Sequence, residues 1–290
     1  MKILVMGTGG MLGSAVFKLF AETGGYELSG TVRDEATKQY FPDEWHKNII
    51  AGIDILDNES LARVVGSVKP DVVINCVGLI KQLATANDPL IVLPVNSMYP
   101  HRLAVICASS GARLIHISTD CVFDGSKGNY VESDRPDATD LYGQSKYIGE
   151  LNDKPRAITL RTSIIGHELN SRTGLVEWFL SQSGSVNGFT RAIFSGLPTV
   201  ELARVMMGYV IPRPELCGLY HVSAAPISKF DLLSLVAKIY GKKIEIIPQS
   251  EFMIDRSLNS ERFQTATGYS APDWPALVEA MKASKLVIGA

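Results

Sequence analysis

Short apolar runs alternate with segments of helical periodicity through the first 165 residues of the chain. Leu12, Val16 and Phe20 repeat at the spacing of one helix face. The runs that predict strands are four to six residues long and mostly apolar: Ile3–Met6, Glu27–Val32, Ile49–Ile53, Val72–Cys76, Arg113–Ser118 and Ala157–Leu160. Such strands are typical of a parallel sheet buried on both faces. Helical segments between them, including 58–68 and 90–109, predict a doubly wound α/β sheet.

The alternation loosens after residue 165. A strand in "GLYHVS" (218–223), a helix from Ser228, a strand at Lys243–Ile247 and a last helix after Pro275 predict a smaller α/β lobe. We therefore expect one domain over residues 1–165 and a second lobe formed mainly by 166–290. The chain is expected to cross between the two lobes around 195–222.

Composition narrows the class of protein. The 290 residues carry 46% hydrophobic and 20% charged side chains and a net charge of −2, which gives no electrostatic case for a nucleic acid or an anionic membrane. The first apolar run is short and glycines follow it at once, so it reads as a strand and not as a signal peptide. No apolar stretch approaches the roughly 20 residues of a membrane helix. Four cysteines and five histidines without metal-ligand spacing predict no metal site, and a cytoplasmic location is expected.

A glycine motif follows the first strand directly. Gly7, Gly10 and Gly13 form G-x-x-G-x-x-G in "MGTGGMLG", with Thr8, Met11 and Leu12 between or beside them. One glycine allows the tight turn, one allows the backbone to approach a pyrophosphate, and one allows the helix to pack on the sheet. The helix N-terminus then offers N–H donors to the phosphates. A plain glycine-rich turn is the alternative, but the strand–loop–helix context favours a Rossmann-type dinucleotide-binding domain over 1–165.

Residues after the second and third strands bear on which dinucleotide binds. Arg33 stands near the place where an acid would select NAD, and an arginine there suits the 2′-phosphate of NADP. We expect NADPH, with NADH as the alternative, and a solvated surface arginine as the other interpretation of Arg33. Asp54 and Ile55 follow the third strand, where they could meet the adenine.

Tyr142 and Lys146 lie four residues apart and share a helix face. A nearby ammonium favours the phenolate, so we expect Lys146 to lower the tyrosine pKa and make the phenol usable in acid–base catalysis. The strand before them ends at Thr119, whose hydroxyl can bind a substrate oxygen. In open α/β sheets ligands bind beyond the carboxyl ends of the strands. Further cofactor contacts expected near this edge are Cys76, Val77, Gly78, Asn96, Thr162 and Ile164.

These motifs together resemble the extended short-chain dehydrogenase/reductase superfamily. Within it, "STDCVFDG", "YGQSKYIGE", "LRTSIIG", "GLPTVELA", "GLYHVSA" and "RSLNSERF" look like dTDP-4-dehydrorhamnose reductases. The resemblance implies a two-lobed, NADPH-dependent reductase of a nucleotide-linked 4-keto sugar, in surface polysaccharide or deoxysugar biosynthesis. It assigns catalysis to Thr119, Tyr142 and Lys146, and substrate binding to Arg256 and Asn259.

The sequence also departs from that family. Cys121 stands where the family has a tyrosine, and "NCVGLIKQ" replaces its N-A-A-A, so Lys81 and Gln82 lie where the sugar should approach. These changes leave open the sugar, the stereochemistry at C4 and the nucleotide, which could be dTDP, UDP or GDP. They do not alter the expected reaction type.

Other polar and aromatic residues are candidates for the substrate site. Besides Lys81, Arg256 and Asn259, the substrate contacts we expect are Asp120, Cys121, His167, Trp178 and Arg191. Three of these have a plainer interpretation: a turn cap for Asp120, core packing for Trp178, and surface placement for Arg191.

Two alternatives to a reductase stay open. One is an epimerase or dehydratase with bound NAD, but dehydratases of this superfamily have Glu where Cys121 stands, and a thiol is a poor acid for expelling water. The other is a non-catalytic NADP-binding regulatory subunit, which the intact Thr119, Tyr142 and Lys146 set disfavours. A homodimer is the candidate assembly.

Overall fold

A parallel sheet of seven strands forms the centre of the computed structural model, which describes residues 1–82 and 84–286; residues 287–290 of the expected second lobe lie outside it. The strand order is β10-β6-β5-β4-β1-β2-β3, and every neighbouring pair is parallel. Its strands are β1 (Lys2–Met6), β2 (Glu27–Thr31), β3 (Ile49–Ile50), β4 (Val72–Asn75), β5 (Arg113–Thr119), β6 (Ala157–Thr162) and β10 (Gly218–His221). The predicted Rossmann-type doubly wound sheet is confirmed.

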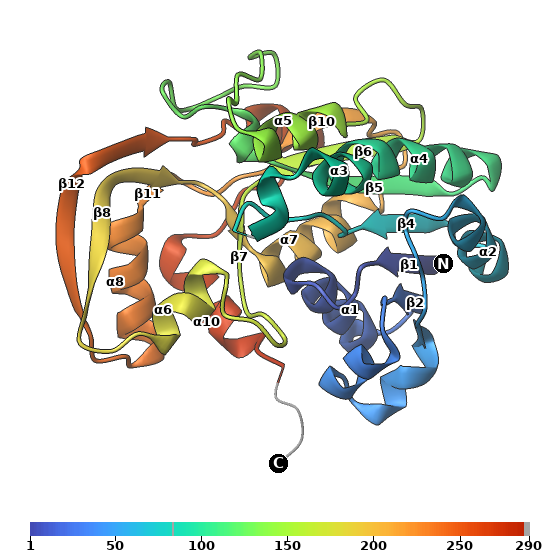
Figure 1. The fold of residues 1–290 in the computed structure, drawn as a ribbon, viewed down its shortest axis with the longest axis horizontal. Coiled ribbons are helices and arrows are strands. Elements are labelled where there is room, and N and C mark those ends of the chain that lie inside the picture. The colour runs from blue at the N-terminus through green and yellow to red at the C-terminus, as the bar shows by residue number, and fades with distance from the viewer. Residues whose placement is uncertain (83, 287–290) are drawn as a thin grey trace.

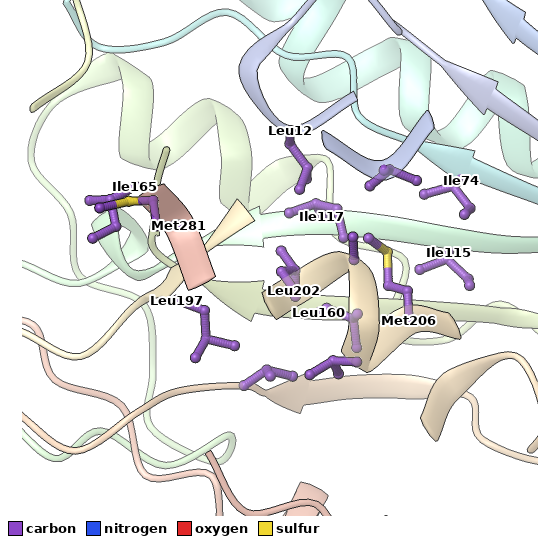
Figure 2. Packing of buried hydrophobic residues seen from close by; sticks show 14 of the residues in the cluster. Leu12, Ile74, Ile115, Ile117, Leu160, Ile165, Leu197, Leu202, Met206 and Met281 are labelled. Carbon is purple, nitrogen blue, oxygen red and sulfur yellow. The ribbon is translucent and has the colours of Figure 1, made fainter. Parts of the chain in front are cut away.

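Helices cover both faces of this sheet (Figure 1). On one face α1 (Met11–Thr23) and α7 (Thr199–Val205) share a core with alternate strand residues such as Ile74 and Leu160. Figure 2 shows this packing, with Leu12 of α1 and Leu202 of α7 directed toward the strands. On the other face α2 (Asn58–Val68) and α4 (Tyr99–Ser109) pack on the remaining strand residues. Burial on both faces is why these strands are apolar without a polar alternation.

A second lobe lies beside the carboxyl edge of the sheet, on the left in Figure 1. Its sheet has the order β11-β8-β12, and a pair of short strands, β7 and β9, connects it to β6. The elements of this region are β7 (Ile164–Ile165), α6 (Leu175–Ser181), β8 (Ser185–Phe194), β9 (Leu197–Pro198), β11 (Ile227–Ser228), α8 (Lys229–Tyr240), β12 (Glu245–Asp255), α9 (Glu261–Thr267) and α10 (Trp274–Ala283). The strand expected at 243–247 therefore begins later and is longer, and β8 was not expected.

The chain returns to the large sheet after β9. Strand β10 pairs with β6, although its sequence pattern had grouped it with the smaller lobe. The path from β9 through α7 and the π-helical turn η6 (Met206–Val210) brings it there. The shorter helical turns are η1 (Glu35–Tyr40), η2 (Asp43–Asn48), η3 (Ala84–Asn87) and η5 (Asp120–Val122).

One helical run of 21 residues, Pro89–Ser109, is long and apolar enough by composition to cross a membrane, which the sequence analysis did not expect. It consists of α3 (Pro89–Val92), the π-helical turn η4 (Leu93–Met98) and α4. Tyr99, Leu103 and Cys107 of this run are packed in the core behind the sheet. That placement accounts for the buried side chains of the run, whereas Leu90, Met98 and Val105 are exposed.

Candidate active site

A cleft of about 730 Å³ opens where the carboxyl ends of β4, β5 and β6 face the second lobe. Its inner walls come from the glycine loop (9–12), the segment after β4 (75–82), the end of β5 (117–121) and the end of β6 (162–165). Tyr142 and Lys146 of helix α5 (Leu141–Ile148) complete that end. The outer walls come from the second lobe. Residues far apart in the sequence thus meet at the edge that the strand order selects.

The glycine loop has the geometry of a dinucleotide cradle. Gly7 has φ +81°, and a Cβ there would lie 2.7 Å from the Val77 side chain. A Cβ on Gly13 would overlap the carbonyl oxygen of Gly7, so the loop can close onto the helix only without one. Gly10 is the N-terminal cap of α1, whose first N–H groups have no helical partner and are free for an anion.

Some of the predicted loop residues shape this cradle and others face the cleft. Gly10, Met11 and Leu12 line the cleft, together with Gly9, which the sequence analysis did not name. Thr8 is buried and its hydroxyl donates to the Val5 carbonyl at 3.2 Å, so it holds the loop on the strand.

The residues after β4 also fall into two groups. Cys76, Val77 and Gly78 line the cleft. Asn96 lies behind them: its Oδ1 accepts from the Leu79 N–H at 2.9 Å and its Nδ2 donates to Ser145 Oγ at 3.2 Å. Asn96 therefore ties the segment after β4 to helix α5.

Arg33, Asp54 and Ile55 lie outside the cleft lining. The Arg33 side chain is 88% exposed and its Nε lies 3.2 Å from Asp34 Oδ2. Asp54 Oδ1 accepts from the Leu56 N–H at 2.9 Å, which closes a turn, and Ile55 packs on the core around α2. Any contact of these residues with a cofactor would be at the surface of the domain.

The three predicted catalytic residues come together. Thr119, Tyr142 and Lys146 all line the inner cleft, and so do Thr162 and Ile164. Helix α5 can lie close to the segment after β5 because residue 143 is a glycine. A Cβ at this position would overlap the Cys121 carbonyl oxygen. Asp140 caps the helix by accepting from the Gly143 N–H at 2.9 Å.

The electrostatics of the pair differ from the sequence-based expectation. Burial raises the pKa of Tyr142 above its usual value, and the neighbouring Cys121 adds to this, while a hydrogen bond with Thr119 works against it. The expected net lowering of the Tyr142 pKa was wrong, because the desolvation of the phenolate raises this pKa and is the largest effect on it. Lys146 Nζ instead donates to the Ile117 carbonyl at 2.8 Å. Burial lowers the pKa of Lys146 to about 8.

Asp120 and Cys121 lie beside the catalytic hydroxyl. The Thr119 hydroxyl contacts Asp120 Oδ1 at 3.1 Å and accepts from the Cys121 N–H at 3.1 Å. Burial raises the pKa of Asp120, although Arg256 opposes this, and burial raises the pKa of the Cys121 thiol to about 12. A thiol with that pKa is not a nucleophile near neutral pH. Arg256 Nη1 lies 3.8 Å from Cys121 Sγ, and its Nε donates to the Phe123 carbonyl at 2.7 Å.

Three predicted substrate residues are absent from the cleft lining, whereas Lys81, Trp178 and Arg256 are part of it. The His167 ring is held between Glu177 Oε1 at 2.6 Å and the Tyr240 hydroxyl at 2.9 Å. Arg191 Nη2 lies against Met253 Sδ at 2.8 Å.

Asn259 is the third of these residues. It lines a separate, shallower pocket of about 440 Å³, and its Oδ1 accepts from the Glu261 N–H at 2.9 Å. These three placements correct the sequence-based assignment: His167 and Arg191 are engaged within the second lobe, and Asn259 lies in a pocket beside Tyr220 of β10.

The outer wall contains residues that the sequence analysis missed. Asn187 and Phe189 of β8, Lys229 at the start of α8, and Phe252 of β12 line the cleft. The Phe189 and Phe252 rings lie 5.3 Å apart between centroids. The pairing of β8 with β12, which brings them together, has no local sequence signal, whereas Lys229 could have been found directly after the Ser228 helix start.

Comparisons with known proteins agree with this architecture. A family model described as the RmlD substrate binding domain matches residues 1–285. The chain belongs to this family. The match also confirms the resemblance to the dTDP-4-dehydrorhamnose reductase-like branch of the extended short-chain dehydrogenase/reductases.

Individual relatives have different names. The probable low-salt glycan biosynthesis reductase Agl14 of Haloferax volcanii is 31% identical over 86% of this chain and 84% of its own length. Methionine adenosyltransferase 2 subunit beta of Xenopus laevis is 25% identical over 99% of this chain and 83% of its own. The crystal structure of dTDP-4-dehydrorhamnose reductase from Bacillus anthracis in complex with NADP superposes with a TM-score of 0.80 at 21% identity, covering 98% of this chain and 99% of that one. This last likeness shows the shared fold.

Proposed function

We propose that this chain is an NADPH-dependent reductase of the 4-keto group of a nucleotide-linked 6-deoxy sugar. The observation that carries the proposal is the meeting of Thr119, Tyr142 and Lys146 in one cleft that begins at a dinucleotide-type glycine loop. The name of the Haloferax volcanii relative, a glycan biosynthesis reductase, supports a role in polysaccharide or deoxysugar synthesis.

The reaction would use the side chains of the inner cleft as follows. A reduced nicotinamide, when bound, supplies the hydride for the sugar C4. The Thr119 hydroxyl binds the carbonyl oxygen and orients it toward Tyr142. Because the pKa of Tyr142 is raised by burial, the phenol stays protonated near neutral pH and can donate its proton to that oxygen. The Lys146 ammonium, fixed by the Ile117 carbonyl, stabilises the phenolate that is left.

The outer end of the cleft carries cationic and aromatic side chains, which suit the nucleoside diphosphate part of a nucleotide sugar. Within residues 1–82 and 84–286, neither Lys229 nor Arg256 forms an ion pair with a carboxylate, and both line the cleft. Trp178 and the Phe189–Phe252 pair offer aromatic surfaces. Cations suit the diphosphate and aromatic rings suit the base. This supports a nucleotide sugar over a free sugar as the substrate.

The preference for NADPH rests on Arg33. Its guanidinium is exposed beside the loop end of β2 with Nε 3.2 Å from Asp34 Oδ2, and a 2′-phosphate would meet it at the surface of the domain. Arg33→Ala is expected to weaken NADPH binding about tenfold and to leave NADH binding unchanged. Equal losses for the two cofactors in fluorescence titrations would refute this part of the proposal.

Two other functions remain to be separated from reduction. An epimerase or dehydratase with bound NAD needs an additional acid or base, and the Cys121 thiol, with its pKa of about 12, fits that role poorly. A regulatory role is raised by the likeness to a methionine adenosyltransferase subunit, but the complete catalytic set favours an enzyme.

The deciding experiment is a panel of dTDP-, UDP- and GDP-linked 4-keto sugars incubated with the chain and NADPH or NADH. Loss of the absorbance of the reduced cofactor with one of them, and a product reduced at C4, is the expected result. Conversion of the sugar without net cofactor oxidation would favour the epimerase or dehydratase. Binding of NADPH without conversion of any sugar would favour the regulatory role.

A further inference from the structure

A buried ion pair lies directly behind the reaction centre. Glu150 accepts from Arg161 through two parallel contacts, Nε to Oε1 at 2.9 Å and Nη2 to Oε2 at 2.7 Å. Each side chain is only 1% exposed. The Ser118 hydroxyl, one residue before Thr119, donates to the same Oε1 at 2.7 Å. Asn152 Nδ2 also donates to Oε2 at 3.4 Å, so four hydrogen bonds fix the carboxylate, and the proposed reaction uses none of them.

The sheet register explains why Arg161 is so well held. Arg161 of β6 is paired with Ser118 of β5 on one side and with His221 of β10 on the other. Residues opposite each other in neighbouring strands have side chains on the same face of a sheet. His221 Nε2 lies 3.0 Å from Arg161 Nη1, and its Nδ1 lies 3.0 Å from the Tyr130 carbonyl. Burial, with Arg161 adding to it, lowers the pKa of His221 to about 3, so the ring is neutral and can accept from the guanidinium.

Stability alone is a poor explanation for this pair. The desolvation of two buried ions largely offsets their attraction, so replacing such a pair by apolar residues is often neutral for folding. Its position offers a better explanation. Glu150 lies four residues after Lys146 and eight after Tyr142, immediately beyond the end of α5. The end of α5 packs against the backbone of Asn96, and this is possible because residue 149 is a glycine. A Cβ at this position would overlap the Asn96 carbonyl oxygen.

The charge on Lys146 depends on what surrounds it. Burial is the main effect on its pKa and lowers it, whereas the negative charge of Glu150 raises it. On the strands behind, His116 of β5 has a pKa well below its usual value and His221 of β10 is also neutral, while Arg161 of β6 is positive. Among the charged groups in the part of the chain that the structure describes, Glu150 is the one whose charge raises the pKa of Lys146, although Asp120 lines the same cleft.

We propose that Glu150 is a positioning residue: held by Ser118 of β5 and Arg161 of β6, it fixes the end of α5, and with it the place of Lys146, against the sheet. The catalytic consequence rests on the proposed reduction. The charge state of Lys146 is a property of the chain itself and can be measured without a substrate.

The test follows the ¹³Cε signal of Lys146 by NMR in lysine-labelled protein, assigned by its loss in Lys146→Met. The wild-type signal is expected to titrate with a midpoint near pH 8. Glu150→Gln is expected to lower that midpoint by about one pH unit, and Glu150→Asp, which keeps the charge, to restore most of the shift. The matched control is Glu201→Gln, which removes a buried carboxylate of α7 that accepts from the Tyr269 hydroxyl at 3.1 Å; it should leave the midpoint unchanged.

A second variant covers the case in which Glu150→Gln fails to fold because a buried guanidinium loses its partner. Glu150→Gln/Arg161→Gln removes both charges, and because the loss of the Arg161 cation favours the ammonium form, it is expected to lower the Lys146 midpoint by less than Glu150→Gln does. With a substrate from the panel, the alkaline limb of the kcat profile should move by the same amount as the midpoint. An unmoved midpoint in folded variants, even with a kcat lowered equally at all pH values, would overturn the inference. A wild-type chain that reduces no keto sugar would instead contradict the proposed function, while the Lys146 titration would still decide this inference.

Discussion

The inner and outer ends of the cleft are built in different ways. At the inner end Lys146 is 6% exposed and lies on a helix that touches the backbone of Cys121 through Gly143 and that of Asn96 through Gly149. At the outer end Phe252 is 50% exposed and lies on β12, an edge strand of a small sheet. The inner groups are fixed by backbone contacts that tolerate no added atom, whereas the outer side chains have room to move.

This difference indicates a division of labour. Groups that transfer protons must be held within a fraction of an ångström, which close-packed strands and helices provide. Groups that recognise the variable part of a substrate can lie on exposed segments that change without disturbing the core. Substitutions at the inner end should therefore change kcat, and substitutions at the outer end should change KM.

The largest effect is expected for Tyr142→Phe. It removes the proton donor from the inner end without changing the packing of the ring, so kcat should fall by about 10²–10⁴-fold. NADPH affinity, measured by fluorescence titration, should change less than twofold. Tyr147→Phe is the matched control, because Tyr147 lies on the same helix and is 45% exposed. Turnover retained in Tyr142→Phe would disprove the assigned role.

The next effect concerns pH. The pKa of Lys146 is lowered to about 8, so the ammonium is present below pH 8 and is lost as the pH rises through that value. The pKa of Tyr142 is raised, so the phenol remains protonated across the same range. We expect kcat to be constant around pH 6–7 and to fall about tenfold for each pH unit well above 8. A profile that stays level to pH 10 would show that the charge on Lys146 is not needed.

A smaller effect is expected at the outer end. Lys229→Ala removes a cation from the cleft wall and should raise KM for the nucleotide sugar about tenfold with kcat nearly unchanged. Lys238→Ala on the exposed side of the same helix α8 is the control and should change neither constant. If Lys229→Ala lowered kcat and left KM unchanged, the division between the two ends would be wrong.

The two ends also differ in how far the sequence predicts them. The inner end follows from local signals: Gly7, Gly10 and Gly13 need backbone room, and Thr119 ends a buried strand. The pairing of Tyr142 with Lys146 follows from helical spacing. The spacing does not show how deeply Tyr142 is buried. Burial raises the pKa of Tyr142, so the predicted direction of its shift was wrong.

The outer end depends on a pairing between distant segments. Strand β8 has Asn187, Gly188, Thr190 and Arg191 among its residues, so its sequence shows no clear strand pattern. Its partner β12 advances four residues from Gln249 while β8 advances two, which is a bulge that only the paired structure reveals. The assignments of His167, Arg191 and Asn259 to the cleft failed for the same reason, because each depends on how the second lobe folds.

The smallest effect is expected for Cys121→Ser, and it tests which reaction the inner end performs. Since the thiol has a pKa of about 12, it is uncharged during turnover, and a hydroxyl of similar size can occupy its place beside Arg256. Cys121→Ser should therefore change kcat and KM for reduction less than threefold, as should Cys217→Ser at an exposed position. A loss of more than a hundredfold in Cys121→Ser alone would mean that the thiol transfers a proton. An additional group that transfers a proton is what an epimerase or dehydratase needs, so that result would favour one of those reactions over a simple reduction.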